Sequence, residues 1–320
     1  MADTTGRVTL WGIEVFAATA EERSISAAAR RLDASASAVS QQLTNLEAAL
    51  GTVLMDRSAR PIALTPSGEL FRRRAQVILN EAAEARAELT GRDLSQLMRF
   101  NLGMIEDFDA DVTPRLLSQM GDRLSSSRFL LETGASHRLY DLLEHRALDM
   151  IVAAEIGATA SWMEVHPLLE EPFVAAVPKG LVGDGDPLEV LRKTPLIRYT
   201  TRHLMGRQID EHLVAEGLRL EYRFELDSYH SIMAMVASGA GWSILTPLGV
   251  MRAGRFRDAV EIIELPLAPL SRRISLIARK DALFGMPAEI AGRLRPLLED
   301  LIVAPCRLRM PLLGDSFRVL

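Results

Sequence analysis

Two helix-forming segments separated by a tight turn make up residues 24–57, SISAAARRLDASASAVSQQLTNLEAALGTVLMDR. In the first segment, Ala28, Ala29 and Leu32 are small or apolar residues at helical spacing, so a second helix can cross closely there. The two residues after Leu32 form the predicted turn. This arrangement is typical of a helix-turn-helix DNA reader, although an ordinary helical subdomain fits the pattern equally well.

The second segment is predicted to be the helix that enters a DNA groove. Its inward positions repeat at spacings of four, three and four, at Val39, Leu43, Leu46 and Leu50. Short polar side chains on its other faces suit contacts with base edges and phosphates. The residues of this helix that we predict to contact DNA are Ser35, Ser37, Ser40, Gln41 and Gln42.

A short wing is predicted to follow this helix. Arg57 and Arg60 flank a turn that ends at Pro61, and residues 62–64 form the expected returning strand. Together with Arg30, these arginines are placed to hold DNA phosphates, even though the 320 residues carry a formal net charge of −5. Local placement of charge, rather than the net charge, therefore supports DNA binding.

An ordered set of residues runs through this N-terminal quarter: Leu10, Phe16, Ser24, Ala28-Ala29, Leu32, Ser35, Ala38-Val39-Ser40, Gln42-Leu43, Leu46-Glu47, Leu50-Gly51, Leu54, Arg57 and Leu64-Thr65-Pro66-Ser67-Gly68. The set resembles that of LysR-type bacterial transcriptional regulators. Two positions depart from the family pattern, because Ala36 stands where glutamine is usual and Met55 where phenylalanine is usual. The missing glutamine removes one base contact, so the resemblance implies an operator that differs from the common family sequence.

The resemblance implies an α/β protein with a helix-rich winged helix-turn-helix, a long linker helix and a two-lobed α/β domain like that of periplasmic binding proteins. The implied boundaries are 7–65 for the DNA-binding domain, 66–90 for the linker and dimerisation helix, 91–302 for the effector-binding domain (lobe I 91–163 and 267–302, lobe II 168–263) and 303–320 for a C-terminal tail.

One long helix is predicted from Thr65 onward. Its apolar residues form a heptad seam at Phe71, Ala75, Ile78, Ala82, Ala85 and Leu89. Such a stripe needs a partner, which is either another part of the same chain or the same helix of a second subunit. The resemblance implies the second arrangement, in a homodimer or homotetramer that places two reading heads on one DNA duplex.

Beyond about residue 91, short apolar runs alternate with helical patterns, which is typical of an α/β domain. Strands are predicted at 98–105, 129–132, 150–154, 173–178, 196–199, 222–226, 242–246, 262–265 and 273–278. Helices are predicted at 112–120, 137–145, 204–216, 231–238 and 287–301. Two chain crossings, near 164–167 and 264–266, are expected to divide the region into the two lobes.

In such lobes a ligand lies where strand ends meet the N-termini of the helices that follow. The resemblance brings four segments there, at 105–108, 134–137, 198–201 and 227–230. The effector-binding residues that it implies are Ile105, Glu106, Asp107, Phe108, Ser136, His137, Arg198, Tyr199, Thr200, Thr201, Asp227 and Tyr229.

Asp107 and Arg198 suggest a ligand with two kinds of charge. An acid at position 107, where the family more often has a small hydroxyl residue, favours an amine or a polar neutral group. The planar guanidinium of Arg198 suits a carboxylate, so an amino-acid-like effector is one hypothesis. The alternative is that Asp107 and Arg198 pair with each other or with neighbouring residues.

Other function classes find little support in the 320 residues. No apolar run has the length of a membrane span and no signal segment precedes residue 10, so we expect a soluble cytoplasmic protein without a membrane partner. The single Cys306 excludes a two-cysteine switch within one chain and disfavours redox sensing. Phosphate-loop, nucleophile-elbow and zinc-protease motifs are absent and the histidines lack a cysteine-rich partner set, so we expect neither enzyme, metal site nor cofactor.

The sequence therefore favours a ligand-responsive DNA-binding regulator whose partners are double-stranded DNA, a small-molecule effector and RNA polymerase. An effector that binds one arrangement of the lobes better than another would shift the spacing of the reading heads and so alter DNA bending. A solute-binding protein that keeps the lobes without DNA recognition is the second hypothesis.

Overall fold

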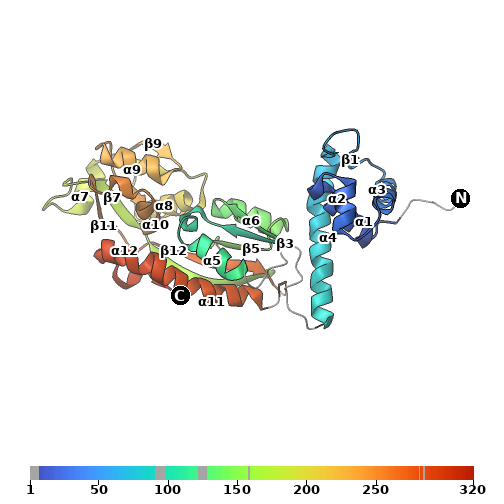
Figure 1. The fold of residues 1–320 in the computed structure, drawn as a ribbon. Coiled ribbons are helices and arrows are strands. Elements are labelled where there is room, and N and C mark those ends of the chain that lie inside the picture. Colours follow the sequence, from blue (N-terminus) through green and yellow to red (C-terminus); the bar gives the residue numbers. More distant parts are fainter. Residues whose placement is uncertain (1–6, 91–98, 122–127, 158, 281, 284) are drawn as a thin grey trace. The chain divides into compact units, whose positions relative to one another are not determined.

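The computed structural model describes residues 7–90, 99–121, 128–157, 159–280, 282–283 and 285–320. The described residues divide into two compact units, the first within residues 1–99 with Arg128, and the second within 100–121 and 129–320. Each unit is described separately below, with its elements labelled as in Figure 1.

The first unit begins with three helices, α1 (Leu10–Glu22), α2 (Ile25–Arg31) and α3 (Ala36–Leu50). Each starts at a hydroxyl residue whose side chain accepts a hydrogen bond from a backbone N–H group of the first turn; these residues are Thr9, Ser24 and Ser35. Helix α3 ends at Gly51, whose φ of 66° lies in the left-handed region. The predicted pair of helices joined by a turn is therefore present as α2 and α3.

The wing is a short antiparallel pair of strands, β1 (Met55–Asp56) and β2 (Ala63–Leu64), and it leads into the long helix α4 (Pro66–Thr90). Gly68 allows α4 to start close to the wing, because a Cβ atom there would lie 2.0 Å from the carbonyl oxygen of Leu54. The apolar core between these elements is formed by buried residues of the four helices, including Phe16, Ala28, Leu43 and Ala75, and by Leu54 just before β1.

Helix α4 uses part of its apolar seam within its own unit. Ala75 is buried, and the Phe71 ring meets the Phe16 ring of α1 edge-on at 5.1 Å between centroids. Ile78 and Leu70 remain 38% and 60% exposed. Packing within the chain, rather than against a second subunit, thus accounts for Phe71 and Ala75 at the start of the predicted heptad seam. The structure does not describe the side chain of Leu89 at its end.

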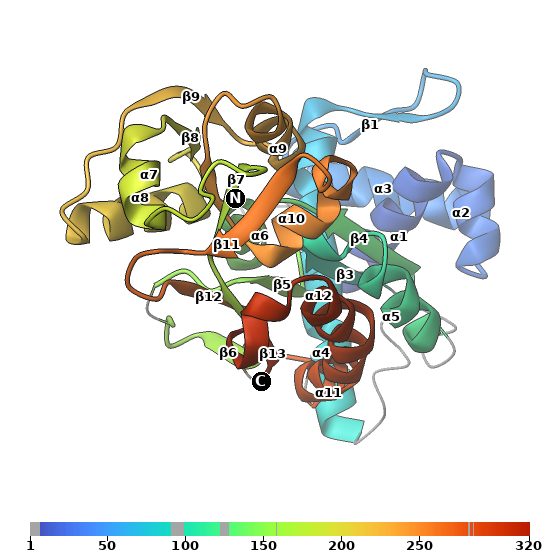
Figure 2. The same cartoon turned by 90° about the vertical axis from the view of Figure 1, so that its left-hand side faces the viewer.

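The second unit contains a six-stranded sheet in the order β13-β6-β12-β5-β3-β4. Its strands are β3 (Arg99–Met104), β4 (Arg128–Thr133), β5 (Met150–Ala154), β6 (Met163–Pro172), β12 (Ser271–Arg279) and β13 (Arg318–Val319). The helices α5 (Val112–Gly121) and α11 (Met286–Leu298) lie on one face of this sheet, and α6 (Ser136–Glu144) lies on the other (Figures 1 and 2).

A three-stranded sheet in the order β10-β7-β11 and a parallel pair of strands, β8 and β9, form the other half of this unit. The elements of this half are β7 (Val174–Pro178), α7 (Pro187–Lys193), β8 (Leu196–Tyr199), α8 (Leu204–Ala215), β9 (Tyr222–Leu226), α9 (Tyr229–Ala237), β10 (Ser243–Leu245), α10 (Pro247–Arg252) and β11 (Val260–Glu264). Two chain passages, from β6 to β7 and from β11 to β12, connect the halves.

Strand β6 differs from the predicted chain crossing at 164–167. It pairs with β12 from Met163 to Pro172, with one irregularity in register, so residues 168–172 belong to the six-stranded sheet rather than to the second lobe. The chain changes sheets at Phe173, because only there does β6 give way to β7, which pairs with β10 and β11.

The C-terminal tail packs on the second unit. After α11 the chain forms a π-helical segment, η4 (Glu299–Val303), the short helix α12 (Ala304–Arg309) and the 3-10 segment η5 (Pro311–Ser316). Strand β13 then adds to the edge of the six-stranded sheet beside β6. Cys306 is buried in this segment, with 1% of its surface exposed.

Candidate functional site

Helix α3 presents a polar face that its own unit does not bury. Ser37 and Gln41 are exposed, whereas Ser40 and Gln42 are half-buried. The Gln41 amide donates to Asn45 Oδ1 at 2.9 Å, one turn further along the helix. Ser37 and Gln41 are thus open to solvent, as groups that read base edges must be.

The start of α3 is also polar and exposed. The Ser35 hydroxyl lies 3.0 Å from that of Ser37, and it accepts from the Ala38 N–H at 3.1 Å. Ser35 therefore caps the helix, and an exposed helix N-terminus is a favourable position for a phosphate. Arg30 of α2 is exposed as well.

Arg57 is held in place by Glu47, which belongs to the family pattern but was given no role from the sequence. Its guanidinium donates to Glu47 Oε2 at 2.7 Å and to Thr44 Oγ1 at 3.2 Å. The other oxygen of Glu47 accepts from the backbone N–H groups of Leu54 and Met55. Glu47 thus ties the wing to α3, and Arg57 is fixed beside the polar face.

Arg60 stands at the turn of the wing. It is exposed, and its Nη1 donates to the carbonyl oxygens of Arg57 and Ala59 at 3.0 and 3.2 Å. Polar and basic residues predicted for DNA contact therefore occupy the outer surface of α2, α3 and the wing.

A cavity of about 350 Å³ lies in the second unit, where elements of its two halves meet. Eight of the predicted effector residues line it: Ile105, Glu106, Asp107, Ser136, His137, Tyr199, Asp227 and Tyr229. Further side chains that line the cavity were not predicted from the sequence, and the polar or polarisable ones are His203, Met205, Gln208, Arg252 and Arg272. The volume suits a small organic molecule.

Four predicted effector residues do not line this cavity. Phe108 is fully buried in the core. Arg198 donates to Asp210 Oδ1 at 2.7 Å and stacks on the Tyr222 ring, so it pairs with neighbouring residues as the alternative hypothesis stated. Thr200 donates to Glu225 Oε1 at 2.8 Å, and the same oxygen accepts from the Thr201 N–H.

The orientation of Arg198 follows from strand geometry. Side chains alternate across a strand, so the position of Tyr199 in the cavity directs Arg198 to the opposite face. The hypothesis that Arg198 receives a ligand carboxylate in this cavity is therefore wrong.

Arg272 is the centre of a buried ionic network beneath the cavity. Its Nε donates to Glu171 Oε2 at 2.7 Å and its Nη2 donates to Asp107 Oδ2 at 3.0 Å. The other oxygen of Glu171 accepts from the Leu248 N–H at 2.7 Å. Burial raises the pKa of the Glu171 carboxyl, and the positive charge of Arg272 acts in the opposite direction.

This network connects both halves of the unit. Asp107 follows β3, Glu171 ends β6 and Arg272 begins β12, while Leu248 lies on α10. Glu171 and Arg272 each stand beside a residue of like charge, Glu170 and Arg273, so no local pattern in the sequence marked them as a buried pair. Asp107 is thus already occupied by a guanidinium.

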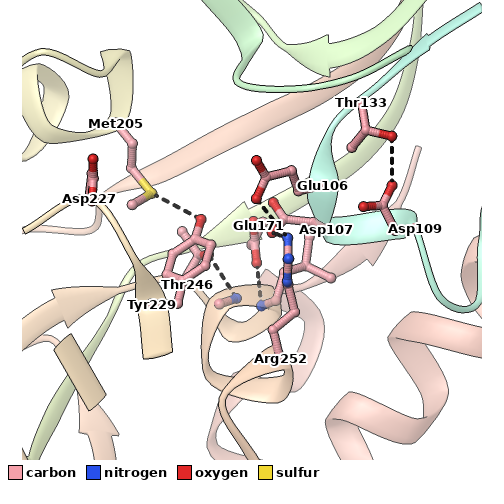
Figure 3. A network of polar contacts seen from close by, with 12 residues as sticks. Glu106, Asp107, Asp109, Thr133, Glu171, Met205, Asp227, Tyr229, Thr246 and Arg252 are labelled. Carbon is pink, nitrogen blue, oxygen red and sulfur yellow. Dashed lines mark hydrogen bonds and ion pairs between the residues drawn. The ribbon is translucent and has the colours of Figure 1, made fainter. Parts of the chain in front are cut away.

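Arg252 lies at the boundary of the cavity, at the end of α10. Its Nη1 is 3.5 Å from Glu106 Oε2 and 3.6 Å from Asp107 Oδ1 (Figure 3). This nitrogen is buried and makes no hydrogen bond with the residues that the structure describes. The contact is therefore an attraction between charges without directed hydrogen bonds.

Aromatic side chains form another wall of the cavity. The Tyr199 ring lies 5.7 Å from the Tyr229 ring and 5.9 Å from the His203 ring, between centroids. His203 in turn lies 5.4 Å from His137. Burial raises the pKa of Tyr199 to about 12 and lowers the pKa of His203, so the phenol stays protonated and the imidazole is neutral at pH 7.

Both parts of the chain match known family models. Residues 10–69 match bacterial regulatory helix-turn-helix proteins of the lysR family, and residues 96–288 match the LysR substrate binding domain. The chain belongs to the LysR family. It is accordingly a DNA-binding transcriptional regulator rather than an enzyme, and the family match favours this function over a solute-binding protein that keeps the lobes without DNA recognition.

Relatives of this LysR-family chain include proteins named for hydrogen peroxide. It is 29% identical over 286 residues to a probable hydrogen peroxide-inducible genes activator of Mycobacterium avium, covering 88% of this chain and 91% of the relative. It is 24% identical over 270 residues to the DNA-binding transcriptional dual regulator OxyR of Escherichia coli K12, covering 83% and 88%.

Among solved structures, a C206 mutant of Corynebacterium glutamicum OxyR has the same fold. The TM-score is 0.67 at 22% identity, with 95% of this chain and 96% of the other covered.

Within the part of the chain that the structure describes, no helix is long and apolar enough to cross a membrane, and no cluster of three metal-ligating side chains occurs.

Proposed function

We propose that this LysR-family regulator reads its operator with the polar face of α3 and holds the DNA backbone with the arginines around it. The proposal rests on the exposure of Ser37 and Gln41 and on the tether from Glu47 to Arg57. Base contacts carry the sequence preference and phosphate contacts carry the salt dependence.

Two substitutions separate these roles. Replacing Gln41 with alanine removes an exposed amide, so it is expected to change the preference among operator variants with little loss of stability. Replacing Arg57 with alanine is expected to weaken every site and to reduce the salt slope by about one counterion. Competition titrations across operator variants measure both, and equal effects of the two variants on every sequence would contradict the assignment.

The same proposal includes control by a small molecule bound in the cavity. A ligand that contacts both halves of the second unit favours the arrangement in which those contacts form together. The regulator would act as a homodimer or homotetramer in the cytoplasm, joined in part by the exposed residues of α4, with RNA polymerase as a further partner. Light scattering with and without DNA tests the assembly.

We infer that this regulator does not use a disulfide switch, although relatives are named as hydrogen peroxide-inducible activators. The 320 residues contain one cysteine, so two thiols of one chain cannot pair. Burial raises the pKa of Cys306 to about 12, which leaves little reactive thiolate at pH 7. Operator binding that is unchanged by peroxide, in the wild type and in Cys306→Ser, is the expected result; a peroxide response that Cys306→Ser abolishes would overturn it.

A further inference from the structure

The cavity of the second unit holds more negative than positive groups. Glu106, Asp107 and Asp227 line it, and Glu171 is hydrogen-bonded to the lining residue Arg272. The guanidinium groups at the cavity belong to Arg252 and Arg272. Four carboxylates therefore meet the two guanidiniums of the cavity, and the exposed Arg202 outside it, 3.8 Å from Asp227, leaves a surplus of one negative charge.

The two guanidiniums are already engaged by acids at short range. Arg272 is hydrogen-bonded to Glu171 and Asp107, and its side chain is 9% exposed. Arg252 lies within 3.6 Å of Asp107 and within 3.5 Å of Glu106. An incoming anion would have to compete with these carboxylates.

Glu106 and Asp227 are the carboxylates that a ligand can reach. Their side chains are 60% and 58% exposed. Outside the cavity, Arg202 Nη2 lies 3.8 Å from Asp227 Oδ2. The Arg202 side chain is 79% exposed, so water screens this ion pair. Figure 3 shows the Asp227 and Glu106 carboxylates on opposite sides of the Tyr229 hydroxyl group.

The aromatic wall lies close to these acids. The Tyr199 hydroxyl donates to the backbone carbonyl oxygen of Asp227 at 3.2 Å. After the larger effect of burial, the charges of Asp107, Glu106 and Asp227 raise the pKa of Tyr199, while Arg272 lowers it. The Tyr199 and Tyr229 rings offer π faces, and a cation near an aromatic face gains attraction that grows when water is excluded. Carboxylates beside aromatic rings are therefore suited to bind an organic cation.

We propose that the effector is an organic cation, with a protonated amine or alkylammonium group held by Glu106 and Asp227 against the wall formed by Tyr199 and Tyr229. This inference rests on the proposed control by a cavity ligand and specifies its chemistry. The cavity of about 350 Å³ exceeds the size of a bare metal ion, so an organic molecule fits it better.

A cation at this position would also act on conformation. Glu106 follows a strand of the six-stranded sheet, whereas Asp227 follows β9 in the other half of the unit. Their like charges repel across an empty cavity, and a bound cation replaces this repulsion with two attractions. Cation binding therefore favours the arrangement in which the two halves approach.

Calorimetric titration of the full chain with three four-carbon probes tests the charge preference. 1,4-Diaminobutane, 4-aminobutanoate and succinate have the same chain length and carry two positive charges, one of each sign and two negative charges. The expected order of affinity is diaminobutane, aminobutanoate and then succinate. Succinate binding best, through Arg252, would overturn the proposal, and so would the absence of heat from all three probes at 10 mM.

Substitutions then locate the site. Glu106→Gln and Asp227→Asn keep size and polarity, and each is expected to weaken diaminobutane about tenfold to a hundredfold because one charge-assisted contact is lost. The matched control is Asp258→Asn, an acid with a 94% exposed side chain outside the cavity lining, which should leave the affinity unchanged. Equal affinities for all three variants and the wild type would contradict the assigned position.

Operator binding, measured on the same preparations without a probe, distinguishes the inference from the proposed function. Retained operator binding together with a preference for succinate would overturn only the cationic ligand. Diaminobutane binding that requires Glu106 and Asp227, but changes no DNA affinity or footprint, would support the site and contradict its regulatory role.

Discussion

Replacing Glu171 with glutamine should cost the second unit about 3–5 kcal/mol of unfolding free energy, the usual effect of breaking a buried ion pair. Glu171 is fully buried, and its two oxygens accept from Arg272 Nε and from the Leu248 N–H, each at 2.7 Å. Glutamine has one acceptor oxygen, so its NH₂ group must face one of these donors. That donor then stays buried and unsatisfied, which alone costs about 1–3 kcal/mol.

The loss of charge adds to this cost. Arg272 retains Asp107 at 3.0 Å, so it is not left without a carboxylate, and the expected effect falls short of complete unfolding. The pKa of Glu171 is raised by burial, and the two donors favour its ionised form. Because both oxygens accept hydrogen bonds, the charged carboxylate explains the geometry better than the acid does.

Urea unfolding followed by tryptophan fluorescence measures this effect. A Trp11→Phe background leaves Trp162 and Trp242, which both lie in the second unit. Asp258→Asn is the control, because its ion pair with an arginine is exposed and is expected to contribute less than about 0.5 kcal/mol. A Glu171→Gln variant as stable as this control would refute the claim that an ionised Glu171 holds the two halves together.

The remaining predictions concern packing and titration. Gly68→Ala should destabilise the first unit by about 1–3 kcal/mol, because its Cβ would meet the Leu54 carbonyl oxygen at 2.0 Å; urea unfolding with Trp11 retained reports on that unit. Gly292→Ala, in a helix of the second unit with no atom within 4 Å of the new Cβ, should be neutral or slightly stabilising in the Trp11→Phe background. Cys306 should react with a thiol reagent at pH 8 only after unfolding, since burial raises its pKa to about 12, and rapid labelling of the native protein would contradict its burial. Burial lowers the pKa of His203 in the folded protein, so the unfolded chain binds more protons as the pH falls below 6.5, and the contribution of His203 to the unfolding free energy is lost as pH falls through the folded-state pKa. A His203→Gln variant should therefore lose less stability than the wild type between pH 7 and pH 5. Equal losses of unfolding free energy in the two proteins over this range would exclude the effect.

Local patterns in the sequence were sufficient for most elements. The strand predictions at 150–154, 196–199 and 222–226 agree with β5, β8 and β9, because short apolar or alternating runs between turn residues specify strands well. Strand β6 was not predicted, because a segment with two prolines, Pro167 and Pro172, and several acidic residues is typical of a loop. In the structure, Pro167 lies at the irregularity in the pairing of β6 with β12, where a missing N–H group is tolerated.

The candidate site was only partly accessible from sequence. Four chain segments near strand ends were expected to meet, and each contributes residues to the cavity. The contacts of Arg272 with Asp107 and Glu171 join residues that are 165 and 101 positions apart, so no local pattern specifies them. Strand alternation allows only one of Arg198 and Tyr199 to face the cavity, and the structure was needed to show that it is Tyr199.

The most direct test of the whole account is a titration of the purified protein against the intergenic DNA beside its own gene, with a nonspecific competitor and at two salt concentrations. We expect binding that is tighter than to the competitor, that weakens with salt as phosphate contacts require, and whose sequence preference depends on Gln41. Binding no tighter than to the competitor at either salt concentration would contradict it.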